Sequence, residues 1–172
     1  ERQMTNEIPS YQRIRVQFAK LDPLKYISHL DVARTWERVF RRACLPVAHS
    51  QGFNPRPRFQ IAAALPVGVT GKQELLDIWL SKPLPPEQVR DRLRAVVPPG
   101  LEIGDAEDVD LSAPSLQSQM RAADYRAVIH SLESVDGIQV RIQAFLALHS
   151  LLRQREHKGK WQTYDLRPLV QT

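Results

Sequence analysis

Two histidines and one aspartate are the residues of this sequence best suited to acid–base catalysis. His29 and Asp31 lie at the start of a predicted helix, and His49 follows that helix, before a loop rich in Gly, Asn and Pro. Two histidines can serve as general base and general acid when the 2′-hydroxyl of RNA attacks the adjacent phosphate. His29, Asp31 and His49 are therefore the candidate catalytic residues. The alternative is that His29 and Asp31 cap the helix while His49 forms hydrogen bonds within a sheet.

The same three residues are not expected to bind a metal ion, and no cofactor is expected. Asp31 is needed at the helix start, and no closely spaced set of ligands accompanies the two histidines. The chain has one cysteine, which excludes an intrachain disulfide and a multi-cysteine zinc or iron–sulfur site. We expect Cys44 to be a buried, unreactive thiol, because it falls on the apolar side of the predicted helix.

Arginines in the same region form a candidate surface for binding polyanions. The chain has 24 Lys and Arg against 19 Asp and Glu, a formal net charge of +5. Residues 32–60 contain six arginines and one acidic residue, so the excess lies there. Arginine makes bidentate contacts with phosphate, and an aromatic ring can stack on a base. The candidate nucleic-acid-binding residues are Arg34, Arg38, Arg41, Arg42, Phe53, Arg56 and Arg58. The alternative is a solvated basic face paired with acids elsewhere in the chain.

An amphipathic helix positions most of these side chains. It begins at Ser28, whose hydroxyl can accept a hydrogen bond from the Asp31 N–H, and it ends before Pro46. Its apolar residues recur at helical spacing, and the arginines fall on the opposite face. Glu37 is expected to pair with Arg41 one turn later.

The order of predicted elements indicates an α+β protein. We expect strands at residues 13–19, 58–65, 74–80 and 101–106, with helices after the first and third. This β-α-β-β-α-β order is typical of a ferredoxin-like split βαβ unit. It is predicted to span residues 11–111, after a tail at residues 1–10.

The remaining third of the chain is predicted to repeat part of this pattern. Residues 112–122 are expected to be a linker. Residues 123–172 are expected to form a partial second ferredoxin-like unit packed on the first, with a strand at 123–129, a helix at 137–152 and a final strand at 162–170. No apolar run reaches the roughly 20 residues of a membrane span. We therefore expect a cytoplasmic protein that does not enter a membrane.

Several motifs resemble a radical-SAM-linked bacterial family of unknown function. They are ISHLD at residues 27–31, WERVFRRA at 36–43, PVAHSQGFNPRP at 46–57, ALPVGV at 64–69, ELLD at 74–77 and KGK…YDLRPL within 158–169. The resemblance implies a domain fused behind, or encoded beside, B12-binding radical SAM proteins, often near genes for ribonuclease E/G-type and ribosomal proteins. A radical SAM cluster needs three cysteines, so this chain is not itself the radical SAM enzyme.

Three functions are compatible with these features. The first is an RNA-binding or substrate-presenting module that acts with a radical SAM protein in tRNA or rRNA processing or modification, without catalysis of its own. The second is an RNA-processing enzyme that uses His29 and His49. The third is a protein–protein adaptor for a radical SAM enzyme.

Overall fold

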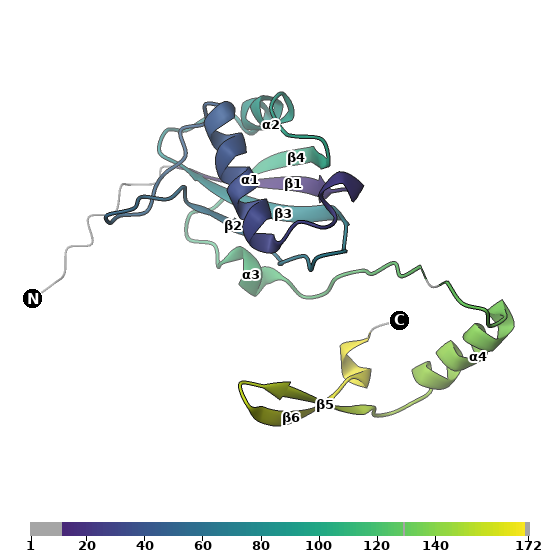
Figure 1. Cartoon of the computed structure of the whole chain (residues 1–172). Helices are drawn as coiled ribbons and strands as arrows, with labels where there is room; N and C mark the ends of the chain where they lie inside the picture. The colour runs from purple at the N-terminus through teal and green to yellow at the C-terminus, as the bar shows by residue number, and fades with distance from the viewer. Residues whose placement is uncertain (1–11, 129, 171–172) are drawn as a thin grey trace, which may run out of the picture. The chain divides into compact units, whose positions relative to one another are not determined.

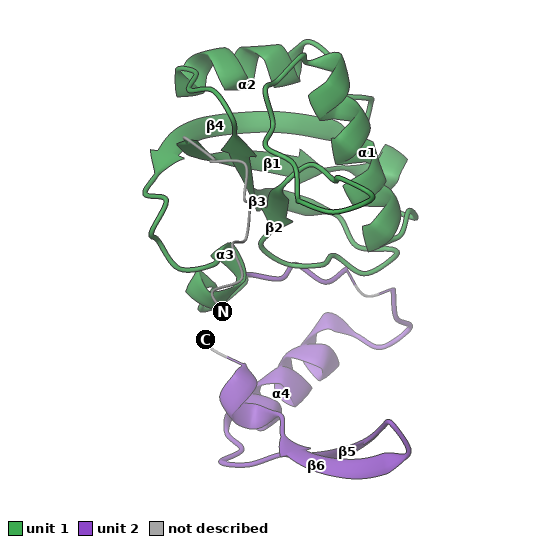
Figure 2. Cartoon of the chain, turned by 90° about the vertical axis from the view of Figure 1, so that its left-hand side faces the viewer, with its two compact units in different colours: residues 1–123 green, residues 124–172 purple. Residues whose placement is uncertain are grey.

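The computed structural model describes residues 12–128 and 130–170. The chain forms two compact units, residues 1–123 and 124–172 (Figure 2). The predicted tail at residues 1–10 lies outside the described residues. No helix in the described part of the chain is long and apolar enough to cross a membrane.

The first unit is a four-stranded antiparallel sheet with two helices on one face (Figure 1). Its elements are β1 (Gln12–Lys20), α1 (His29–Arg42), β2 (Phe59–Ile61), β3 (Gly71–Leu80), α2 (Pro86–Arg94) and β4 (Leu101–Val109). The strand order is β2-β3-β1-β4. This topology confirms the predicted α+β class and is consistent with the ferredoxin-like unit.

The core lies between the sheet and the two helices. Alternate residues of β1 and β3, such as Ile14 and Ile78, point toward the helices and are fully buried. Trp36 of α1 packs on them, with its ring edge-to-face against Phe18 at 5.0 Å and stacked on Phe40 at 5.7 Å. Because these apolar side chains are fixed, the opposite face of α1 must point to solvent.

The helix α1 ends earlier than predicted. Cys44 adopts a left-handed conformation with φ 50°, and its N–H donates to the Arg41 carbonyl at 3.2 Å. The Leu45 N–H donates to the Phe40 carbonyl at 3.2 Å, which completes a common helix-ending pattern. Cys44 is exposed as a result, so the prediction of a buried thiol is wrong.

The second predicted strand is shorter than expected. Only Phe59–Ile61 pairs with β3 as a strand, where residues 58–65 were predicted. Two isolated bridges precede it, one between Val47 and Leu80 and the other between His49 and Pro57. The prolines of this segment lack the N–H that a longer ladder needs.

A buried ion cluster lies on the sheet face away from the helices. Asp77 of β3 is 0% exposed and accepts from Arg13 Nη2 at 2.6 Å and from Arg15 Nε at 2.9 Å, both on β1. Arg13 also donates to the carbonyls of Ala113 and Pro114, at 2.7 and 3.0 Å. The cluster thus joins the two central strands to the segment that follows β4.

Residues 112–122, predicted to be a linker, are therefore partly docked on the first unit. They contain a short helix, α3 (Leu116–Gln119), and Leu116 is 1% exposed. The Leu116 N–H and the Gln117 side chain hydrogen-bond to β2, to the Gln60 side chain and the Ile61 carbonyl. Sequence reasoning missed these contacts because they join residues far apart in the chain.

The described part of the second unit contains the helix α4 (Val135–Leu146) and a hairpin of β5 (Leu152–His157) and β6 (Lys160–Asp165), followed by a 3-10 turn at Arg167–Leu169. The predicted strand at 123–129 is wrong: residues 123–128 form no regular structure, and residue 129 lies outside the described part. A strand needs a neighbour, and β5 and β6 pair with each other. The helix begins and ends earlier than predicted, and β6 with its turn replaces the predicted final strand.

Replacing Asp77 by Asn is expected to lower the free energy of unfolding by about 3–5 kcal/mol, because two arginines stay next to a neutral amide in a buried site. Urea denaturation of the full chain measures this change. The control, Asp105→Asn on an exposed position of β4, should change it by about 0.5 kcal/mol or less. A loss no larger than the control's would show that the cluster contributes little.

Candidate nucleic-acid interface

The start of α1 is fixed by a reciprocal cap. The Asp31 N–H donates to Ser28 Oγ at 3.2 Å, as predicted, and the Ser28 hydroxyl donates to the Asp31 carboxylate at 2.7 Å. The Ser28 hydrogen bond, with Arg34 nearby, lowers the pKa of Asp31 below its ordinary value. Asp31 therefore has a structural role at the helix start.

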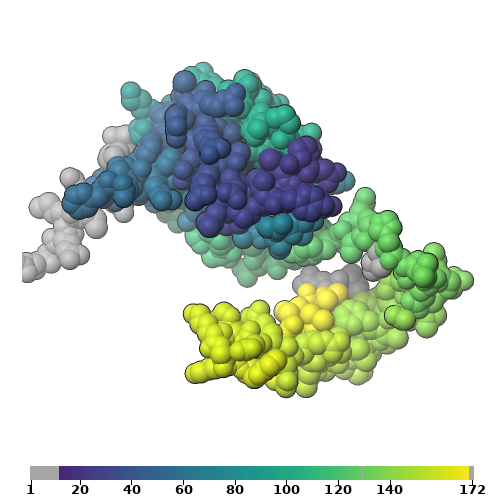
Figure 3. Space-filling model, viewed as in Figure 1, coloured from purple at the N-terminus to yellow at the C-terminus, as the bar shows by residue number. Residues whose placement is uncertain are grey.

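The outer face of α1 carries unpaired cations. Arg34 pairs with Asp31 at 3.3 Å across an exposed position. Arg38, Arg41 and Arg42 are exposed, and none of their guanidinium groups forms an ion pair or hydrogen bond with another described residue. The predicted pair between Glu37 and Arg41 is not formed. We call Arg38, Arg41 and Arg42 the helix arginines. In Figure 3, where the colour follows the residue number, the dark-blue helix α1 lies on the surface that faces the viewer.

The loop after α1 presents an exposed aromatic ring. The Ser50 N–H donates to the Arg56 carbonyl at 2.8 Å, which closes a loop over residues 51–55. Gly52 has φ +128°, a conformation that favours glycine. Phe53 follows it and is 106% exposed. Its ring therefore contributes nothing to the core, whereas Phe59 packs against Phe40 at 5.3 Å.

Arg58 is separated from the helix arginines. Its guanidinium lies 4.9 Å from the centre of the Trp79 ring, and Arg13 lies 5.0 Å from the same ring. Trp79 alternates with Ile78, which faces the helices, so Trp79 lies on the opposite face of the sheet. The structure therefore divides the predicted set: the helix arginines share one face, Phe53 and Arg56 lie on the loop, and Arg58 lies elsewhere.

The three candidate catalytic residues are not brought together. His29 is the first residue of α1, a helix about 20 Å long, and His49 follows its other end. His49 is held there by the bridge to Pro57, with its Nδ1 2.9 Å from the Val47 carbonyl. Across the described ranges, no three His, Cys, Asp or Glu side chains are grouped as metal ligands.

The charged residues that sequence reasoning missed are buried or half-buried. Arg13 and Asp77 are fully buried and Arg15 is half-buried, although each alternates with apolar residues that face the core and so lies on the sheet face where solvent exposure is usual. The signal that could have found them is that opposite charges occur on the first and third strands, which a split βαβ unit places side by side. Lys20 is also buried; its Nζ lies 3.2 Å from the Val69 carbonyl, and desolvation lowers its pKa.

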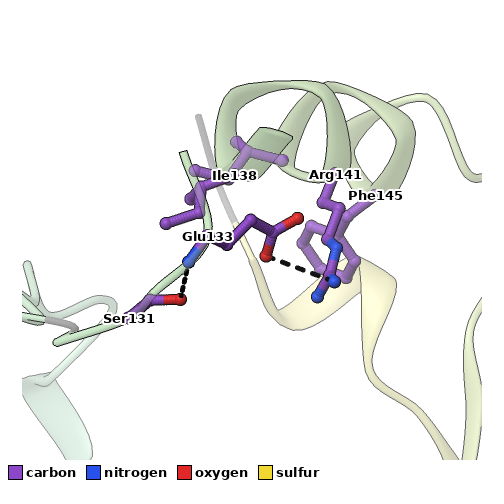
Figure 4. Close-up of a pocket in the computed structure, with 6 residues that line it drawn as sticks. Ser131, Glu133, Ile138, Arg141 and Phe145 are labelled. Atoms are coloured by element: carbon purple, nitrogen blue, oxygen red, sulfur yellow. Dashed lines mark hydrogen bonds and ion pairs between the residues drawn. The ribbon is translucent and has the colours of Figure 1, made fainter. Parts of the chain in front are cut away.

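A hollow of about 330 Å³ on the second unit offers no competing site. Glu133 and Arg141 form an ion pair at 3.2 Å on its wall (Figure 4). The other lining residues are Ser131, Ile138, Ile142 and Phe145. Its charged groups are thus paired with each other rather than directed at a ligand.

Replacing Asp31 by Asn is expected to destabilise the first unit at neutral pH, because the cap favours an ionised carboxylate. The folded pKa lies below the ordinary 3.8, so this stabilisation is present above about pH 4 and is lost as pH falls through the folded pKa. Unfolding free energies of parent and variant, measured from about pH 7 to about pH 3, should converge at the acidic end. Asp124→Asn, at an exposed irregular position, is the control. Equal stability at neutral pH would contradict the capping role.

Comparison with known proteins assigns the family. No curated protein matches this chain. A family model described as "uncharacterized protein conserved in bacteria (DUF2344)" matches residues 13–172, which include both units except for the first residues. The chain therefore belongs to this family of bacterial proteins.

Proposed function

We propose that the chain is an RNA-binding or substrate-presenting module with no catalysis of its own. The observation that carries this proposal is that the helix arginines are exposed on one face of a rigid helix without an acidic partner among the described residues. Their guanidinium groups remain available for bidentate contacts with phosphate.

The loop next to α1 favours RNA over an acidic protein as the ligand. Phe53 exposes its whole ring, and Arg56, three residues after Phe53, is exposed without an ion-pair partner among the described residues. Aromatic rings bind unpaired bases by stacking, and a nearby arginine adds a phosphate contact. An RNA with unpaired bases offers both groups together.

The partner within this proposal is a radical SAM protein that modifies or processes tRNA or rRNA. Its support is the resemblance of the motifs at residues 27–57 to the radical-SAM-linked family. In this arrangement the partner supplies the chemistry and the present chain holds the RNA. Failure of the two proteins to co-purify, with or without RNA, would remove this part of the proposal.

One observation favours an adaptor role as a second candidate. Tyr26, Leu30 and Val67 are exposed apolar residues near the start of α1, away from the helix arginines. The Gly68 N–H donates to the Lys25 carbonyl at 2.9 Å, which places Val67 next to this segment. Exposed apolar side chains at one place are typical of a protein contact. No observation favours the RNA-processing enzyme, because His29 and His49 lie at opposite ends of α1.

Replacing the helix arginines together by Ala should flatten the salt dependence of RNA binding. Each phosphate contact that is lost lowers the log–log slope by about 0.7–0.9, so the triple variant should lose about 2. A single-stranded RNA oligonucleotide and fluorescence anisotropy across a salt series measure this slope.

The matched control removes three exposed cations from elsewhere, Lys72, Lys82 and Arg121. The log–log salt slope of RNA binding by this control variant should stay closer to that of the parent chain. Equal slopes for the two triple variants, or a parent that does not bind at low salt, would rule out the helix arginines as an RNA surface.

Replacing Phe53 by Ala should weaken RNA binding by about 1–2 kcal/mol without changing the salt slope, because the ring contributes stacking but no charge. The free energy of unfolding should not change, since the side chain is exposed. Val67→Ala is the control for losing an exposed apolar side chain. If the two variants bind RNA equally well, Phe53 does not stack on a base.

A further inference from the structure

The register of the β5–β6 hairpin separates its side chains by charge. Directly paired residues of antiparallel strands lie on the same face, and successive residues alternate between faces. The pairing joins Arg153 to Tyr164, Arg155 to Gln162 and His157 to Lys160. These six residues share one face, which we call the basic ribbon face. The other face carries Leu152, Gln154, Glu156, Trp161, Thr163 and Asp165.

All the acidic residues of the two strands lie away from the basic ribbon face. Arg153, Arg155 and Lys160 are exposed, and Lys158 in the connecting turn adds a further cation. None of these four residues forms an ion pair with a carboxylate in the described part of the chain. No carboxylate of the described residues therefore neutralises the positive charge of this face.

The basic ribbon face also contains an aromatic ring. Tyr164 is 38% exposed, and the Arg155 guanidinium lies 5.9 Å from its ring centre. A surface that combines cations with an aromatic ring is the usual platform for single-stranded nucleic acid, whose bases stack while the phosphates contact the cations.

We propose that the basic ribbon face is a second binding site, and that its ligand is single-stranded RNA. This inference rests on the proposed function, because one RNA molecule would contact both this face and the helix arginines. Paired RNA is a poor ligand for a ribbon, since the major groove of its helix is deep and narrow. A purely acidic peptide would use the cations but would leave Tyr164 without a stacking partner.

Two sites on one chain make binding bipartite. Residues 120–128 and 130–134, which lie between α3 and α4, form no helix or strand, so no regular element of the described chain links the two units. Once one site holds the RNA, binding at the other becomes intramolecular and takes place at a high effective concentration. Loss of either site should then weaken the affinity by at least about tenfold.

The test uses the full chain and a single-stranded RNA oligonucleotide long enough to reach both units. Replacing Arg153, Arg155 and Lys160 by Ala should lower the log–log salt slope by about 2. Tyr164→Ala should weaken binding about fivefold or more without changing the slope, whereas Trp161→Ala, on the opposite face, should change neither. A variant with Arg153→Lys and Arg155→Lys keeps the charge and should retain the parental slope.

The outcomes separate this inference from the proposed function. We call the triple Ala replacement of the helix arginines the helix variant, and that of Arg153, Arg155 and Lys160 the ribbon variant. If the salt slope becomes flatter for the helix variant but not for the ribbon variant, the second site is overturned and the proposed function stays intact. A flatter slope for the ribbon variant alone overturns the role of the helix arginines and keeps the second site. Equal binding of a duplex RNA, or equal competition by polyglutamate, overturns the assignment to single-stranded RNA. Circular dichroism of each variant checks that the hairpin is retained.

Discussion

The first unit depends on one buried carboxylate. An ionised group without solvent is stable only when hydrogen-bonded counter-charges surround it, and Asp77 has Arg13 and Arg15. This requirement fixes the register of the two central strands, because a shift by one residue would turn Asp77 toward the apolar core. It also fixes the segment after β4, since the remaining donors of Arg13 reach the Ala113 and Pro114 carbonyls. The pairing of β1 with β3 and the docking of the segment that leads to α3 therefore both involve this cluster.

The same cluster determines where a ligand can bind. Many RNA-binding domains with a comparable four-stranded sheet stack bases on the face away from the helices. Here that face holds Asp77 with its arginines, Trp79 between Arg13 and Arg58, and the docked α3. Arg13 and Arg15 on this face pair with Asp77, and Arg58 lies against the Trp79 ring. Three cations without an ion-pair partner among the described residues, Arg38, Arg41 and Arg42, lie together on α1, so the helical side is where an anionic partner would find clustered, available charge.

Local patterns predict most of the first unit but not the contacts that close it. Apolar spacing identifies β1, α1, β3, α2 and β4, and a polar outer face follows from the buried one, which is why the spacing of the helix arginines was predicted. Cys44 was predicted to be buried but is exposed, because a residue other than glycine that adopts the left-handed conformation gives no signal in the sequence. The position of Arg58 apart from the helix arginines was not predicted, because the loop at residues 51–55 reverses the chain and brings Arg58 against the Trp79 ring. The hairpin in the second unit was not predicted because its sequence is charged and lacks apolar alternation.

The two units differ in what holds them together, and this difference affects what binding can do. No described side chain of the second unit is buried; polar contacts join its parts instead. The Asp165 carboxylate accepts from the Leu151 and Arg167 N–H groups at 2.7 and 3.0 Å, and Arg167 donates to the Leu146 carbonyl at 3.0 Å. With so little apolar burial, a ligand that binds only the folded hairpin contributes a large share of its stability. An RNA strand on the basic ribbon face would therefore order the second unit as it binds, whereas α1 is already fixed by the core before any partner arrives.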